Sequence, residues 1–200
     1  MGQRNSGYER KPSDFYATPA WVTEALLPHL PRIHGGIVWE PAAGDGVMAD
    51  VLRRHLTCDV VATDIAPAIG CERRIDEYDF LQGPPRYRSV DAVITNPPFG
   101  KDAGRFIEQA LSVTRPTRGF VAMLLRTQFD HGKGYQHLFS RHPAWATKLM
   151  LTRRIVWFVE ANGKPKASPS DCHSWFIWDW RHRGPPTIAY GPDEIMEAAE

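Results

Sequence analysis

Residues 37–64 read IVWEPAAGDGVMADVLRRHLTCDVVATD and contain the pattern from which the fold can be predicted. The segments Ile37–Glu40 and Asp59–Asp64 have the length and apolar content of buried strands. Between them, the glycines of Pro41–Gly46 predict a tight turn that leads into a helix over Val47–His55. A strand, a glycine turn, a helix and a second strand form half of a doubly wound α/β fold.

The second strand of this unit ends in an acid, Asp64, about twenty residues after Gly44. In doubly wound folds, glycines allow the backbone to approach a nucleotide, and an acid at this spacing binds ribose hydroxyls. A glycine pair alone is weak evidence for such a ligand. The preceding strand, the following helix and the terminal acid together favour a nucleotide-like ligand over a plain structural turn.

A second motif, Asn96-Pro97-Pro98-Phe99, directly follows the apolar run 89–95, SVDAVIT. The run predicts a short buried strand, which two consecutive prolines cannot continue because each lacks the backbone N–H of a strand ladder. The chain therefore leaves the sheet at Asn96. This places an amide side chain, the rigid carbonyl of Pro97 and the ring of Phe99 at the carboxyl end of a strand.

The motif suits transfer of a group to a planar amino nitrogen, whose delocalised lone pair makes it a poor nucleophile. The Asn96 side-chain oxygen and the Pro97 carbonyl are two acceptors that can hold both N–H protons and draw the nitrogen toward tetrahedral geometry. Phe99 offers a face on which a flat substrate can stack. The alternative interpretation is a rigid turn without chemistry, because Asn-Pro and Pro-Pro are common in turns.

The chain as a whole has the composition of one soluble globular domain. Its 200 residues are 42% hydrophobic and 24% charged, with a net charge of +1 that neither requires nor excludes nucleic acid. Three widely spaced cysteines, and histidines without metal-ligand spacing, predict no disulfide framework, no metal and a reducing, cytoplasmic location. No apolar run reaches the about 20 residues of a membrane span, and the polar N-terminus does not resemble a signal peptide.

We expect a flexible arm over 1–13, one α/β domain over 14–184 and a peripheral tail over 185–200. Thr18 as helix cap and Pro19 as first helical residue predict a helix over 20–27. The patterns predict further elements: helices over 103–114 and 136–141, and strands over 119–125, 148–152, 155–159 and 172–180. The polar segments 126–135 and 160–171 are expected to be loops, the first of them mobile. Packing is expected for three tryptophans, Trp157, Trp175 and Trp178.

Five motifs, in this order, resemble those of S-adenosylmethionine-dependent amino-methyltransferases, above all small phage-type and bacterial DNA adenine-N6 methyltransferases. They are DFYATP (14–19), WEPAAGDG (39–46), TD (63–64), YDF (78–80) and NPPF (96–99). The late segments RRIVWF, GKPKASP and HSWFIWDW are similar to that group as well. The resemblance implies a Rossmann-like class I methyltransferase fold, with a mostly parallel seven-stranded sheet, helices on both faces and an antiparallel last strand around 172–180.

The resemblance also implies roles for individual residues. The positions that bind the cofactor, S-adenosylmethionine, in that family correspond here to Tyr16, Thr18, Pro19, Glu40, Pro41, Ala42, Gly44, Gly46, Asp64, Asp79 and Phe80. The catalytic motif is matched by Asn96, Pro97, Pro98 and Phe99. Asn96 stands where many DNA enzymes have aspartate. Asparagine also occurs in relatives that methylate RNA guanine or protein glutamine, so this residue leaves the substrate open.

The leading expectation is methyl transfer to N6 of adenine in duplex or single-stranded DNA, with the base flipped over Phe99. An RNA-base or protein-glutamine methyltransferase is the alternative. A non-catalytic nucleic-acid-binding subunit is a further one, although it would have no use for Asn96. No stretch of about 80 residues is left for a separate recognition domain. We therefore expect loop residues to contact nucleic acid, namely Arg126, Arg153, Lys164 and Lys166. The oligomeric state stays open.

Overall fold

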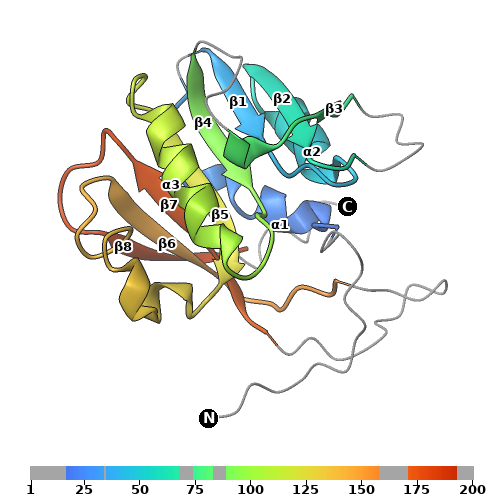
Figure 1. Cartoon of the computed structure of the whole chain (residues 1–200). Coiled ribbons are helices and arrows are strands. Elements are labelled where there is room, and N and C mark those ends of the chain that lie inside the picture. Colours follow the sequence, from blue (N-terminus) through green and yellow to red (C-terminus); the bar gives the residue numbers. More distant parts are fainter. Residues whose placement is uncertain (1–16, 34, 68–73, 83–88, 158–170, 193–200) are drawn as a thin grey trace.

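The computed structural model describes residues 17–33, 35–67, 74–82, 89–157 and 171–192 (Figure 1). In these ranges, eight strands form one sheet in the order β3-β2-β1-β4-β5-β7-β6-β8. The strands are β1 (Ile37–Glu40), β2 (Asp59–Asp64), β3 (Asp76–Glu77), β4 (Val90–Thr95), β5 (Phe120–Arg126), β6 (Trp145–Leu151), β7 (His173–Asp179) and β8 (Thr187–Gly191). The helices are α1 (Ala20–Glu24), α2 (Val47–His55) and α3 (Asp102–Thr114), with short 3-10 turns η1 (Leu27–His29), η2 (Phe80–Gln82), η3 (Phe129–His131) and η4 (Lys133–Tyr135).

The sheet is mostly parallel, as the sequence predicts. Five consecutive strands of the sheet, from β3 through β2, β1 and β4 to β5, are parallel to one another. Strand β7 runs antiparallel to both β5 and β6, and β8 is parallel to β6. The Rossmann-like architecture is thus confirmed. The antiparallel strand expected around 172–180 is β7, but it is not the last strand, because β8 follows it in the chain. The carboxyl ends of β1, β4 and β5 and the amino end of β7 therefore meet at one edge.

The sheet has eight strands instead of the expected seven, because two edge strands, β3 and β8, were not expected and residues 155–157 form no strand. Strand β3 consists of the exposed acids Asp76 and Glu77, which carry no apolar pattern. Strand β8 lies in the segment expected to be a peripheral tail, and it pairs with β6 along its whole length. Residues 187–191 thus belong to the sheet. The expected tail contains part of the α/β architecture because a one-sided edge strand needs little hydrophobic alternation.

Local patterns also fail at three other places. Residues 136–141 form turns instead of the predicted helix. Of the strand predicted over 155–159, residues 155–157 form no strand, and 158–159 lie outside the described residues. The expected mobile loop 126–135 contains η3 and η4. Its Asp130 receives two hydrogen bonds from Lys148 Nζ of β6, at 3.0 and 2.8 Å, and Phe129 stacks on Tyr135 with centroids 4.6 Å apart. Such tertiary contacts hold a polar segment without any signal in the local sequence.

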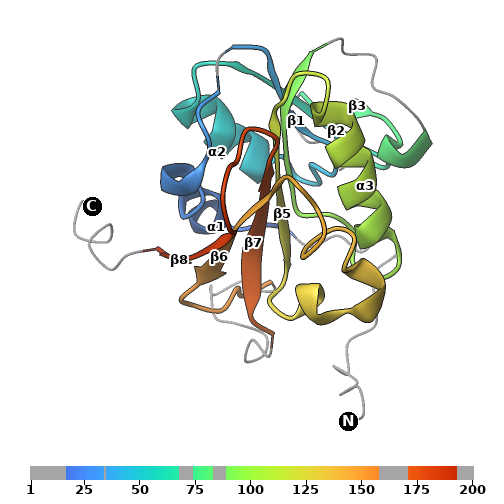
Figure 2. The ribbon, with the colours of Figure 1, turned by 90° about the vertical axis from the view of Figure 1, so that its left-hand side faces the viewer.

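Alternating strand residues pack into two large hydrophobic clusters, one on each face of the sheet, beside a small third cluster of alanines. Trp39 belongs to the cluster under α3, where it packs with Phe106 and its neighbours. Val38 belongs to the opposite cluster, with Val22 of α1 and Leu52 of α2. Figure 2 shows α3 on one side of the strands and α1 and α2 on the other. The prediction of helices on both faces is confirmed.

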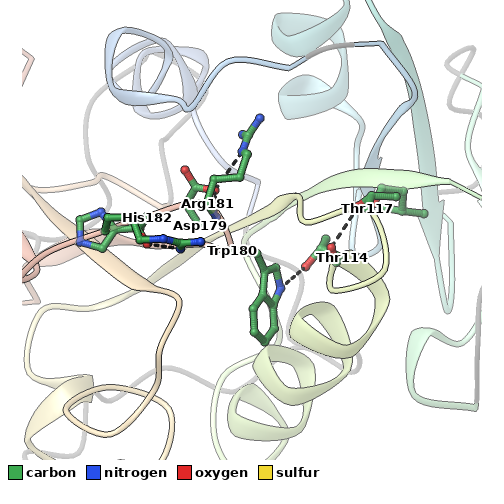
Figure 3. A network of polar contacts seen from close by, with 8 residues as sticks. Thr114, Thr117, Asp179, Trp180, Arg181 and His182 are labelled. Carbon is green, nitrogen blue, oxygen red and sulfur yellow. Dashed lines mark hydrogen bonds and ion pairs between the residues drawn. The ribbon is translucent and has the colours of Figure 1, made fainter.

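A polar network closes the end of the sheet at the start of β5 and the end of β7 (Figure 3). The Thr117 hydroxyl donates to the carbonyls of Val90 (2.8 Å) and Thr114 (3.0 Å). The Trp180 indole N–H donates to Thr114 Oγ1 (3.3 Å), and Arg181 donates to Asp179 (3.2 Å). This network fixes the C-terminus of α3 to the sheet. No helix within the described ranges is long and apolar enough to cross a membrane.

Candidate active site

A cavity of about 940 Å³ opens where β1, β2 and β4 end, at the carboxyl edge of the parallel strands. Ligands bind at this edge in doubly wound folds. The cavity is lined by most of the residues predicted from the sequence: Thr18, Glu40, Pro41, Ala42, Gly44, Asp64, Asp79, Phe80, Asn96, Pro97, Pro98 and Phe99. Of the other predicted cofactor contacts, Pro19 and Gly46 do not line the cavity, and Tyr16 lies outside the described residues.

The turn between β1 and α2 needs its glycines for backbone conformation. Gly44 and Gly46 both have positive φ, 55° and 79°, in the region that side chains disfavour. The Gly44 N–H donates to Asp64 Oδ2 (2.8 Å), and the Ala66 N–H donates to Asp64 Oδ1 (2.9 Å). The Asp64 carboxylate therefore ties the end of β2 to the glycine turn, and it faces the cavity.

Glu40, the last residue of β1, is a buried carboxyl at the cavity wall, only 2% exposed. Burial raises the pKa of Glu40 well above its usual range, and the charge of Asp45 raises it further, while Arg53 acts in the opposite direction. Within the described part of the chain, Glu40 Oε2 has no hydrogen-bond partner. A buried carboxyl oxygen without a donor favours a cationic or hydrogen-bond-donating ligand at this position.

Asp79 and Phe80 line the same cavity as the glycine turn. Asp79 Oδ1 accepts the N–H of Leu81 (2.9 Å), so η2 begins in a side-chain-closed turn. Phe80 is 1% exposed and packs edge-on against Trp39, with centroids 4.9 Å apart, and against Phe106 at 5.0 Å. Phe80 is therefore held by the core, which gives this part of the cavity a fixed apolar surface.

Asn96 directly follows β4 and lines the cavity, and its side chain is oriented by a contact with Thr18, just before α1. Asn96 Nδ2 donates to Thr18 Oγ1 (3.2 Å), across 78 residues of sequence. This corrects the expected role of Thr18, because Pro19 occupies the cap position of α1 and no side chain caps that helix. With the amide nitrogen engaged, Asn96 Oδ1 is a buried acceptor that has no partner in the described residues.

Phe99 belongs to a group of three aromatic rings that sequence reasoning did not bring together. Its centroid lies 6.0 Å from Trp157 and 6.2 Å from His173, and those two rings lie 5.1 Å apart. Trp175 and Trp178 are fully buried in the core, which confirms their expected packing role. Trp157 and His173 had no local signal as site residues, because only the order of β5, β7 and β6 places them beside Phe99.

Other lining residues were also missed, among them Met48, Ile65, Ala66, Asp102, Arg105 and Phe106. Ile65 and Ala66 directly follow the end of β2, so the rule that ligands meet strand ends would have found them. Arg105 is 64% exposed and pairs with Asp102 at 2.9 Å. It is thus a charged group at the cavity mouth, contributed by the first turns of α3.

The predicted nucleic-acid contacts are only partly described. Arg126 pairs with Asp171 at 3.3 Å, and the Arg153 guanidinium lies 4.3 Å from the centre of the Trp21 ring. Lys164 and Lys166 lie outside the described residues. Neither Arg126 nor Arg153 lines the cavity. Among the described residues, no group of three His, Cys, Asp or Glu side chains is placed to hold a metal ion.

No protein-family model matches the chain, and no curated protein matches it. Solved structures do match. A protein from Listeria monocytogenes described as a class I S-adenosylmethionine-dependent methyltransferase has a TM-score of 0.61 and 15% identity, over 86% of this chain and 65% of its own. A modification subunit described for a type I restriction enzyme of Vibrio vulnificus has a TM-score of 0.57 and 17% identity, over 90% of this chain and 48% of its own.

A third matched structure has the same fold but a different description. A protein from Lactococcus lactis described as a hemolysin has a TM-score of 0.56 and 14% identity, over 88% of this chain and 94% of its own. The chain therefore has the fold found in class I methyltransferases, and it spans about half to two thirds of the first two matched proteins. Because proteins described so differently share this fold, the substrate must be inferred from the site.

Proposed function

We propose that this chain transfers a methyl group from S-adenosylmethionine to the exocyclic N6 amine of adenine in DNA. One observation carries the proposal. Asn96 Oδ1, at the end of β4, is a buried acceptor without a partner among the described residues, and it lines the same cavity as Phe99. An unsatisfied amide oxygen beside an aromatic ring fits a planar ring that carries an amino group.

Three features of the cavity support S-adenosylmethionine as the cofactor. The Gly44–Asp64 pair forms the kind of turn that holds the ribose of a nucleoside. Asp79, whose carboxylate accepts the N–H of Leu81 and lines the cavity, suits the amine of an adenine ring. Glu40 is a buried carboxyl whose Oε2 lacks a donor, and it suits the cationic methionine end. When bound, the cofactor supplies an activated methyl group on a sulfonium, which is open to in-line displacement.

The chain's own residues then act on the amine. Asn96 Oδ1 and the Pro97 carbonyl accept its two N–H protons, which draws the nitrogen out of the ring plane and localises its lone pair. Thr18 holds the Asn96 amide so that the oxygen, not the nitrogen, faces the substrate. Phe99 stacks on the ring and fixes the direction of attack. As the lone pair of the nitrogen forms the new bond to the methyl carbon, the bond from that carbon to sulfur would break and leave a neutral thioether. The nitrogen is then cationic and acidic enough to lose its proton to water, so no strong base is needed.

A labelled-methyl transfer assay tests the proposal. S-adenosylmethionine with a tritiated methyl group is offered with duplex DNA, single-stranded DNA, RNA and a protein extract in parallel, and labelled nucleosides are identified by mass spectrometry. We expect label in DNA, recovered as N6-methyladenine. Phe99→Ala should lower the affinity for DNA by about 5- to 150-fold, the factor that corresponds to one lost stacking contact. Label confined to RNA or protein, or no transfer to any substrate, would contradict the proposal.

A further inference from the structure

The three rings of Phe99, Trp157 and His173 form a closed triangle from three separate segments. Phe99 follows β4, Trp157 follows β6, and His173 is the first residue of β7. The Phe99 and Trp157 planes meet at 80°, those of Trp157 and His173 at 78°, and those of Phe99 and His173 at 46°. Of the three residues, only Phe99 lines the cavity. The other two rings therefore support Phe99 without facing the cavity.

His173 is an unusual residue for a purely structural position. It is 3% exposed, and its Nδ1 has no hydrogen-bond partner among the described residues. Burial lowers the pKa of His173 to about 4, with Arg126 lowering it as well and Asp171 opposing. The ring is therefore neutral near pH 7, and the two charges beside it pair with each other at 3.3 Å. A buried ring nitrogen that has no partner among the described residues suggests a role for this histidine beyond packing.

We propose that His173, together with Trp157, is a positioning residue that fixes the angle of the Phe99 ring and thereby the plane in which a substrate ring stacks. The geometric reason is that Phe99 meets Trp157 edge-to-face at 80° and His173 at a tilt of 46°, and two ring contacts at different angles restrain the rotation of the Phe99 ring. The consequence for catalysis rests on the proposed function. A misaligned stacking plane moves the amine of the substrate away from Asn96. Such a displacement of reacting groups lowers the rate of group transfer.

The orientation of the Phe99 ring can be observed by NMR, without a measurement of enzymatic activity. The nine phenylalanines are labelled with 4-fluorophenylalanine, and the Phe99 resonance is assigned in the fluorine NMR spectrum with a Phe99→Leu variant. We expect His173→Ala to shift or broaden this resonance. The matched control is His142→Ala, which removes a half-buried histidine packed on Trp180 at 5.3 Å, away from the cavity. An unchanged Phe99 resonance in folded His173→Ala would overturn the proposal. If His173→Ala does not fold, Trp157→Leu removes the other supporting ring, with the same expectation and the same refuting result.

Steady-state methylation then tests the consequence. In His173→Ala, the KM for DNA should rise about 2- to 10-fold, the factor that corresponds to one aromatic pair, while cofactor affinity stays unchanged. The His173→Phe variant should have a KM for DNA close to that of wild type, because it keeps a ring at this position. Its Tm should be no lower than that of wild type, because the unpaired nitrogen is removed. Equal KM defects in His173→Phe and His173→Ala, or the same defect in His142→Ala, would overturn the proposal. If wild-type protein transfers no methyl group, the proposed function fails, and the fluorine spectrum still decides the role of His173.

Discussion

Replacing Asp64 by asparagine tests the cofactor site with almost no change in shape. The carboxylate accepts the N–H of Gly44 at 2.8 Å and that of Ala66 at 2.9 Å, one on each oxygen. Asparagine keeps one acceptor oxygen and places an NH₂ group against the other N–H. One hydrogen bond to a charged group is then lost, which costs about 1.5–3 kcal/mol.

That internal bond contributes to folding stability, whereas cofactor affinity should fall because Asp64, which lines the cavity, is the proposed contact for the ribose hydroxyls, and a hydrogen bond to a charged group is worth a similar amount in binding. A cost of this size corresponds to about a 10- to 150-fold weaker Kd. Isothermal titration calorimetry with S-adenosylmethionine and S-adenosylhomocysteine measures it directly. Asp76→Asn is the matched control, since Asp76 is an exposed acid on the neighbouring strand and outside the cavity lining. Unchanged cofactor affinity in Asp64→Asn, or an equal loss in Asp76→Asn, would refute the assigned role.

Three further predictions follow from the same cavity and its surroundings. Because burial raises the pKa of Glu40 and a cationic cofactor favours its charged form, binding should release a proton. Affinity should then rise with pH in wild type but not in Glu40→Gln, as calorimetry in buffers of different ionisation enthalpy will show. Thr18→Val removes the hydrogen bond that orients Asn96 and should lower kcat about 2- to 10-fold; an unchanged kcat would mean that Asn96 is oriented by other contacts. Replacing Lys164 and Lys166 together by alanine should reduce the slope of log affinity for duplex DNA against log salt by about two units; a wild-type slope would place the phosphate contacts elsewhere.

The parts of the fold that could be predicted are those with a strong local period. The strand Ile37–Glu40, the helix Val47–His55 and the strand Asp59–Asp64 have the predicted bounds, because buried strands and a glycine turn leave direct traces in the sequence. Strands β3 and β8 lie at the sheet edges, where one-sided burial leaves little pattern. The predicted helix over 136–141 is replaced by turns that pack Leu138 and Phe139 into the core, so tertiary contacts override local propensity.

The candidate site divides in the same way. Glu40, Asp64 and Asn96 were predictable because each lies at the end of a strand, and parallel strands bring their carboxyl ends to one edge. Two other contacts could not be predicted. The hydrogen bond between Asn96 and Thr18 joins residues that are 78 apart in the sequence, and the contact of His173 with Phe99 depends on the position of an antiparallel strand. Contacts of this kind depend on topology, which no single stretch of sequence encodes.

Asn96→Ala, compared with wild type for both cofactor affinity and labelled-methyl transfer to DNA, tests the proposed mechanism most directly. Asn96 Oδ1 is assigned to the reacting amine, so its hydrogen bond should matter chiefly in the transition state. We therefore expect cofactor affinity within about twofold of wild type and a loss of about 100-fold or more in kcat, the scale of removing a group that stabilises developing charge. Near-wild-type methyl transfer by Asn96→Ala would contradict the mechanism.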